Sequence, residues 1–201
     1  MIKSREDYEY YLRCDMASLA KKYISDSDIK KYIRKQPIAK FQFFLRKIEY
    51  LTNCKTGFVH HIIRKVLLRR FYMLSIRLGF TIPINVFGPG LSIAHYGSVI
   101  VNNYAKIGKN CRIHSCVNIG RDTEAPTIGD NVYIGPGVKM WGKIRIGNNV
   151  AIGANAVVTK DVPDGVTVAG IPAKIISNKG SEGLVNKGCD IVDEHLNSLK
   201  K

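Results

Sequence analysis

The sequence predicts an α+β protein. A helical region over residues 1–79 precedes a solenoid of short parallel strands over residues 80–176, and a tail covers residues 177–201. Apolar residues recur at helical spacing through the first region. From residue 80 onward glycine and proline become frequent, and an aliphatic residue recurs every six positions. Neither a helix, with its period of 3.6, nor a simple strand, with its period of 2, selects for a spacing of six.

The helical region begins with Ser4 as the expected cap of a first helix, which places Asp7 at the third helical position. Pro37 interrupts the next stretch. The segment that follows carries an apolar stripe on one face, and Gly57 separates it from a last helix that reaches residue 80. The members of that stripe are Phe41, Phe44, Leu45, Ile48 and Leu51.

The positive charge of the chain lies mainly in this region. Residues 1–80 hold 18 Lys/Arg against 7 Asp/Glu, whereas residues 81–201 hold 13 against 9, within a total of +15. The simplest interpretation is a solvated helical surface; an anionic membrane face reached by the basic helices is an alternative. We expect no nucleic-acid partner, because only the charge points to one and the sequence contains no nucleic-acid recognition motif. The last helix also contains His60 and His61, for which we expect no catalytic role.

The six-residue repeat predicts a three-sided solenoid, with three hexapeptides in each coil of 18 residues. Each repeat residue points into the prism, and the small residue that follows turns a corner. Asn110, Asn131, Asn149 and Asn155 suit the same corners, because asparagine tolerates left-handed backbone angles. The repeat residues are Ile107, Ile113, Ile119, Ile128, Ile134, Met140, Ile146, Ile152 and Val158.

Two irregularities interrupt the repeat. Ile93 and Val101 are eight positions apart, so two extra residues lie around IAHYGSVIV and place His95 at a bulge. Between Ile119 and Ile128 the register slips by three, which predicts a polar loop over residues 121–126. Insertions in solenoids form loops, and loops on rigid scaffolds carry function.

The five cysteines are odd in number and form no close CxxC pair. We therefore expect free thiols in a cytoplasmic protein, with neither a disulfide framework nor a metal site. The charged N-terminus lacks the apolar segment of a secretory signal, and no apolar run approaches the length of a membrane span.

Three stretches of the solenoid, GPGLSIAHYGSVIVNNYAKIGKNCRI, IGDNVYIGPGVK and VTVAGIPAKII, resemble the hexapeptide-repeat acyltransferases, and among these the serine acetyltransferase branch. The resemblance covers residues 80–176 well and the helical region only in general plan. It implies a left-handed parallel β-helix, acetyl-CoA as co-substrate and a homotrimer. It leaves open whether two trimers dock into a hexamer through the N-terminal helices.

The resemblance implies that His95 is the general base, which takes the proton of an alcohol as it attacks the thioester; an ordinary imidazole suits that role near neutral pH. His114, in the slot after Ile113 where glycine is usual, is the rival candidate. Small corner residues would let the pantetheine arm approach the backbone, and a lysine near the end of the solenoid would meet a CoA phosphate. The residues implied are Gly135, Pro136, Gly142, Ala154 and Lys174.

The chain departs from the serine acetyltransferase pattern at three places. The branch has an Asp before the catalytic His, a second Asp about fifteen residues earlier and another His in the following loop. This chain has Ala94, Phe80 and Ala125 there. Free serine needs charged partners for its carboxylate and ammonium groups.

These departures favour a sugar hydroxyl in surface polysaccharide biosynthesis as the acceptor. Serine, in cysteine biosynthesis, is the alternative, and a non-catalytic trimeric scaffold is the second alternative. Asn102 and Asn103, or a backbone carbonyl, would have to orient His95 in place of the missing carboxylate. The candidate acceptor-binding residues are Asn102, Asn103, Asp122 and Glu124.

Overall fold

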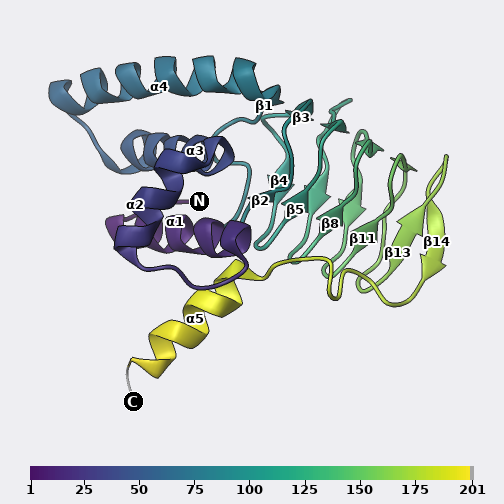
Figure 1. The fold of residues 1–201 in the computed structure, drawn as a ribbon. Coiled ribbons are helices and arrows are strands. Elements are labelled where there is room, and N and C mark those ends of the chain that lie inside the picture. Colours follow the sequence, from purple (N-terminus) through teal and green to yellow (C-terminus); the bar gives the residue numbers. More distant parts are fainter. Residues whose placement is uncertain (200–201) are drawn as a thin grey trace.

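A computed structural model describes residues 1–199. Four helices gather at one end of the molecule, and a solenoid of short strands extends from them (Figure 1). After the last strand the chain runs back along the solenoid and ends in a fifth helix beside the first (Figure 1).

The helices begin where the sequence provides suitable caps. The hydroxyl of Ser4 accepts a hydrogen bond from the Asp7 amide at 3.0 Å, as predicted. A separate short helix, capped by Ser25, precedes Pro37, and Pro37 is the first residue of the next helix, where a missing N–H is harmless. No helix among residues 1–199 is both long and apolar enough to cross a bilayer. The helices are α1 (Arg5–Ala20), α2 (Asp26–Lys35), α3 (Pro37–Cys54), α4 (Phe58–Leu78) and α5 (Gly188–Ser198).

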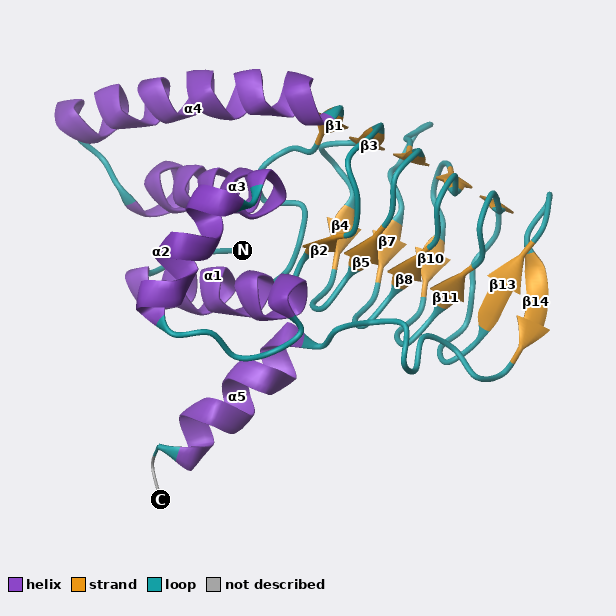
Figure 2. Ribbon diagram, viewed as in Figure 1, coloured by secondary structure: helices purple, strands orange, loops and turns teal. Residues whose placement is uncertain are grey.

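The strands stack into three sheets, which form the faces of a prism (Figure 2). Neighbouring strands are parallel throughout, except for the last pair. The A face consists of β1 (Phe80–Thr81), β3 (Val99–Val101), β6 (Val117–Ile119), β9 (Lys139–Met140) and β12 (Val157–Val158). The B face consists of β4 (Lys106–Ile107), β7 (Thr127–Ile128) and β10 (Arg145–Ile146). The C face consists of β2 (Ser92–Ile93), β5 (Arg112–Ile113), β8 (Tyr133–Ile134), β11 (Ala151–Ile152), β13 (Thr167–Ala169) and β14 (Lys174–Ser177).

The predicted repeat residues fill the interior of this prism. All nine are at most 5 % exposed, and each pairs in register with its counterpart in a neighbouring coil, as Ile113 does with Ile134 and Val158 with Met140. Three of the predicted corner asparagines form a ladder in which Asn110 donates to Asn131 and Asn131 donates to Asn149. All four have positive φ values between 55° and 57°. The period of six thus arises from one inward residue and one corner per side.

Three edges separate the faces, and each has a different environment. The His95 edge follows the C-face strands (94–98, 114–116, 135–138, 153–156 and 170–173). The loop edge follows the A-face strands (102–105, 120–126, 141–144 and 159–160). The tail edge follows the B face and is covered by the returning chain, because Ser181 bonds to Asn149 and Asn131, and the Cys189 amide donates to Asn110. The His95 edge and the loop edge are not covered by the returning chain.

A buried ion-pair network joins the helices to the first coil. The fully buried guanidinium of Arg46 contacts Asp15 at 2.7 Å and Glu49 at 3.0 Å. It also donates to the carbonyls of Phe87 and Gly88, at 2.9 and 2.7 Å. The network therefore fixes the chain immediately before β2 and the His95 edge.

Candidate functional site

His95 lies in a loop that is two residues longer than its counterpart in the next coil. Because Ile93 pairs with Ile113 and Val99 with Val117, residues 94–98 lie over residues 114–116, which confirms the predicted insertion. The loop is fastened to the end of α4, since the Gly97 amide donates to the Leu78 carbonyl at 3.0 Å. The imidazole of His95 is exposed at this edge.

The stacking of these loops brings His114 beside His95. Their ring centroids are 5.6 Å apart, and the ring of Tyr133, from the following coil, contacts that of His114 edge-on at 5.1 Å. The Nε2 atom of His114 is buried and has no hydrogen-bond partner among the described residues. Burial, together with the nearby charges of Arg112 and His95, lowers the pKa of His114.

Burial and the neighbouring charges therefore favour the neutral form of the His114 imidazole, whereas His95 faces solvent. Of two adjacent imidazoles, only one can readily carry a proton, because two like charges would repel each other. The environment thus disfavours a proton on His114. The pair was not predicted from the sequence, although the unusual slot after Ile113 marked His114 as a candidate.

The predicted orienting residues for His95 lie elsewhere in a single chain. Asn102 and Asn103 are at the loop edge, at the opposite end of β3 from His95. The Oδ1 atom of Asn102 accepts a hydrogen bond from the Tyr104 amide at 3.0 Å. Within residues 1–199, no side chain or backbone group makes a hydrogen bond to the ring of His95.

The predicted cofactor residues divide between two edges. Pro136 and Ala154 occupy the positions of His95 in later coils, and Gly135 precedes Pro136, so a path of small residues leads away from the imidazole. Lys174 pairs with Ala169 at the far end of this edge. Four coil spacings of about 4.8 Å place that end roughly 19 Å from His95.

This path fits a slender ligand, because small corner residues leave the backbone of successive coils accessible. Pro136 and Ala154 are exposed there, and the glycine of the next coil, Gly170, is exposed as well. Gly142 lies instead on the loop edge, where a methyl group added to it would be 3.9 Å from Cβ of Asp122.

The candidate acceptor residues gather on the loop edge. The register of Thr127 with Arg145 confirms a three-residue insertion before β7, and this loop carries Asp122 and Glu124. Glu124 pairs with Lys143 at 2.7 Å and lines a hollow of about 210 Å³ together with Arg121. His95 does not line this hollow. A single chain therefore separates the candidate base from the candidate acceptor residues.

The polar side chains on the His95 edge and the loop edge suit acid–base and hydrogen-bond chemistry. Among residues 1–199, no three His, Cys, Asp or Glu side chains are arranged to hold a metal ion. The five cysteines form no disulfide.

Known proteins resemble this chain over the solenoid. Residues 125–160 match the family described as bacterial transferase hexapeptide (six repeats). A serine acetyltransferase from Synechococcus elongatus is 40 % identical over 98 residues, which cover 46 % of this chain and 40 % of the relative. One from Staphylococcus aureus is 42 % identical over 98 residues, covering 46 % of each chain. This chain thus spans less than half the length of these relatives.

Solved structures share most of the fold. The serine acetyltransferase from Brucella abortus in complex with coenzyme A is 27 % identical, with a TM-score of 0.65 over 88 % of this chain and 70 % of that one. A serine O-acetyltransferase from Brucella melitensis is 26 % identical, with a TM-score of 0.68 over 87 % and 69 %. These comparisons confirm the predicted fold class, N-terminal helices followed by a left-handed parallel β-helix, and the resemblance to serine acetyltransferase-like hexapeptide proteins.

Proposed function

We propose that this chain, whose solenoid resembles that of the serine acetyltransferase-like hexapeptide proteins, is an acyltransferase that moves an acetyl group from acetyl-CoA to an alcohol hydroxyl. The observation that carries the proposal is an exposed imidazole, His95, at the head of a path of small residues on an open edge. A relative of the same fold was solved with coenzyme A bound, which supports this class of co-substrate. The free cysteines suit a reducing compartment, and we place the reaction in the cytoplasm.

In the proposed reaction, His95 accepts the proton of the acceptor hydroxyl as its oxygen attacks the thioester carbonyl. The tetrahedral intermediate then breaks its C–S bond, and the imidazolium returns the proton to the leaving thiolate of CoA. The negative charge on the carbonyl oxygen is stabilised by a backbone N–H of the edge. The products are an acetyl ester and free CoA.

We assign His114 a positioning role. Its ring, whose lowered pKa favours the neutral form, lies beside that of His95 and limits the orientations that the His95 ring can adopt. Tyr133 contacts the His114 ring edge-on and restricts its orientation. The pair thereby replaces the carboxylate that position 94 lacks.

The complete site requires a second copy of the chain. Asp122, Glu124 and Gly142 lie on the loop edge, and His95 and Ala154 lie on the His95 edge. Three prisms arranged around a threefold axis can bring the His95 edge of one copy against the loop edge of the next. A homotrimer would have three such composite sites, each with the cofactor residues of one copy beside the acceptor residues of the next. Two trimers that face each other through their helices would form a hexamer.

The names of the relatives favour L-serine over a sugar as the acceptor. One observation favours a sugar hydroxyl as a second candidate. Phe80, where an acidic residue would serve serine, is 3 % exposed and packs edge-on against Phe41 at 5.0 Å, so this position cannot offer charge. Residues 50–121 contain no Asp or Glu at all. A neutral sugar would not require these charges.

The purified chain should release CoA from acetyl-CoA when the correct acceptor is present, as measured with a thiol reagent. L-serine and a panel of nucleotide sugars would be compared at equal concentration. His95→Ala should lose a factor of about 10² to 10⁴ in kcat, the usual contribution of a general base. His61→Ala, a change to an exposed helical histidine, should retain full activity as the matched control.

The outcomes separate the three functions. Turnover with L-serine alone removes the sugar candidate, and turnover with a sugar alone removes serine. Full turnover by His95→Ala removes the base assignment. If the chain neither binds nor consumes acetyl-CoA, it is a scaffold and the proposal fails.

A further inference from the structure

Helix α4 has two apolar faces, and only one of them is packed. Phe71, with Leu74 and Leu78, faces α3 and the core, and the ring of Phe71 stacks on that of Phe41 at 4.8 Å. The opposite face carries a second stripe at helical spacing, which is between 45 % and 65 % exposed. Its members are Val59, Ile62, Val66, Met73 and Ile76. An exposed apolar stripe of this kind marks an interaction site, so this outer face lacks its partner.

The same helix carries strong positive charge. Five cations, Arg64, Lys65, Arg69, Arg70 and Arg77, are interspersed with the apolar residues, and α4 contains no Asp or Glu. None of the five makes an ion pair within residues 1–199. The missing partner is therefore apolar and anionic.

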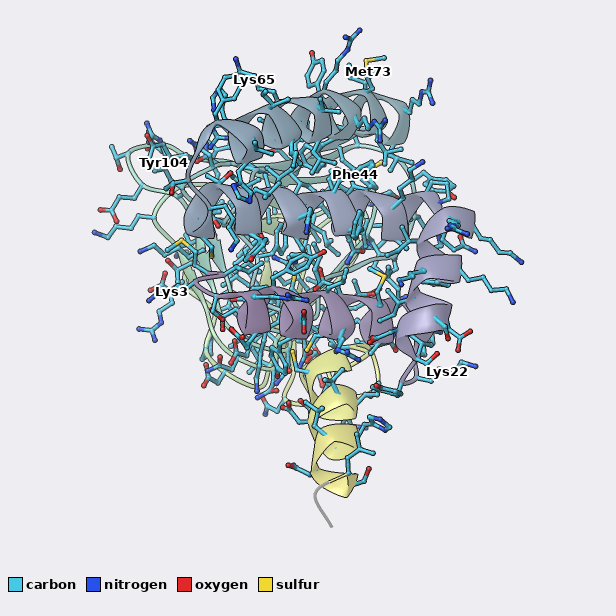
Figure 3. All side chains as sticks on the ribbon, turned by 90° about the vertical axis from the view of Figure 1, so that its left-hand side faces the viewer. Lys3, Lys22, Phe44, Lys65, Met73 and Tyr104 are labelled. Atoms are coloured by element: carbon cyan, nitrogen blue, oxygen red, sulfur yellow. The ribbon has the colours of Figure 1, made fainter. Side chains whose placement is uncertain are left out.

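A groove between α3 and α4 combines both properties. It has a volume of about 530 Å³ and is lined by four cations and four apolar side chains. Figure 3 shows Phe44 between the two helices, and Met73 and Lys65 on the side of α4 that faces away from α3. The lining residues are Lys40, Phe44, Val66, Arg69, Arg70, Met73, Leu74 and Arg77.

We propose that the outer face of α4, defined by the exposed stripe and the groove, docks on an anionic lipid bilayer. The apolar side chains enter the boundary between headgroups and acyl chains, and the arginines contact lipid phosphates. A free phosphate would leave the apolar stripe exposed, whereas a lipid surface covers the stripe and the charges together. The helix is 21 residues long, about 31 Å at 1.5 Å per residue, and lies along the surface instead of crossing it.

A second copy of the chain fits this face less well. Val59, Ile62, Val66, Arg69, Met73 and Ile76 have the spacing of a coiled-coil seam. Parallel copies would place Arg69 of every chain in the shared core and Lys65 of one chain beside Arg70 of the next. Without an acidic residue on the helix, nothing would offset that repulsion.

The proposal is independent of the acetyl-transfer reaction and is tested with the full chain and lipid vesicles. We expect co-sedimentation with phosphatidylcholine vesicles that contain phosphatidylglycerol, and not with phosphatidylcholine alone. Binding should weaken as salt rises from about 0.1 to about 1 M, because the Debye length falls from about 10 to about 3 Å.

Variants then locate the surface. Arg69→Gln with Arg70→Gln should weaken vesicle binding roughly thirty-fold, since each basic residue near an anionic surface contributes about a factor of five. Lys30→Gln with Lys31→Gln removes the same charge from exposed positions on α2 and should leave binding within two-fold, as an order-of-magnitude expectation for residues away from the surface. Ile62→Ser with Met73→Ser should also weaken binding while leaving the circular dichroism spectrum unchanged.

Three results would overturn the proposal. Equal losses from the α2 and α4 charge variants would mean that net charge, not this face, attracts lipid. Equal binding to neutral and anionic vesicles would remove the role of the cations. A chain that ignores vesicles, and whose assembly in light scattering shrinks on Ile62→Ser with Met73→Ser, would show that a second copy covers the stripe.

Discussion

Replacing Arg46 with methionine should be among the most damaging single changes in this molecule. The side chains of Arg46 and Asp15 are fully buried, and that of Glu49 nearly so. Methionine fills much of the space but leaves two carboxylates without their cation. Breaking one side of a buried ion pair costs about 3 to 5 kcal/mol. For a chain of this length, about 2 to 4 °C per kcal/mol gives a fall in Tm of roughly 6 to 20 °C.

The pH dependence of this loss is a second signature. Burial raises the pKa of Asp15, and Arg46 opposes the rise. Without Arg46 the carboxyl binds a proton more readily in the folded chain than in the unfolded one. The free energy of unfolding of the variant then falls as the pH rises above the pKa of an aspartate in the unfolded chain, which is near 3.9. The difference in Tm between the wild type and Arg46→Met should therefore be smaller at about pH 5 than at about pH 8.

Thermal unfolding followed by circular dichroism measures both effects. Arg13→Met is the matched control, because its pair with Asp26 has side-chain exposures of 26 % and 68 % and should contribute at most about 1 kcal/mol. If Arg46→Met unfolds within about 1 kcal/mol of the wild type at neutral pH, the network does not hold the helices to the first coil as argued.

Three further predictions concern the His95 edge and the ladder. The pKa of His114 is lowered, so the unfolded chain binds a proton before the folded one as pH falls below about 6.5, and the wild type loses stability there. The Tm of His114→Gln, relative to that of the wild type, should therefore rise as the pH is lowered from about 8 to about 5. A Tm difference that does not change with pH would contradict the assignment. Ala154→Phe should raise KM for acetyl-CoA at least roughly ten-fold with Tm unchanged, because Ala154 is exposed on the proposed CoA path; an unaltered KM would place the groove elsewhere. Asn131→Ala should cost about 1 to 2 kcal/mol in chemical unfolding, because alanine tolerates a φ of 57° poorly and the ladder loses a rung; a neutral effect would remove the corner role of asparagine.

The solenoid could be predicted from the sequence because its signal is local. One inward residue and one corner recur on every side, so the period of six appears directly in the order of residues. The two insertions were visible as breaks in that period, and they position His95 and the loop with Asp122 as expected. The asparagine corners were likewise predicted from a property of the residue itself.

Features that depend on contacts between distant segments could not be predicted. His114 lies beside His95 because the five-residue loop 94–98 stacks on the three-residue loop 114–116. Nothing in the sequence determines the relative orientation of the two rings. Arg46 finds Asp15 across 31 positions, and neither residue belongs to a motif. The coverage of the tail edge depends on hydrogen bonds of Ser181 and Cys189 that lie in a segment without periodicity.

The separation of groups on the two open edges leads to a prediction about assembly. In one chain, β3 or its equivalents lie between the His95 edge and the loop edge, so a composite site needs the His95 of one copy and the Asp122 loop of another. Two inactive variants, His95→Ala and Asp122→Ala with Glu124→Ala, should therefore restore activity when they are unfolded, mixed in equal amounts and refolded together. With random assembly into trimers, about a quarter of the sites combine an intact base with an intact loop, so about a quarter of the wild-type activity should return. If the base and the loop acted within one chain, no mixture of the two variants could contain an intact site, and the refolded mixture would remain inactive.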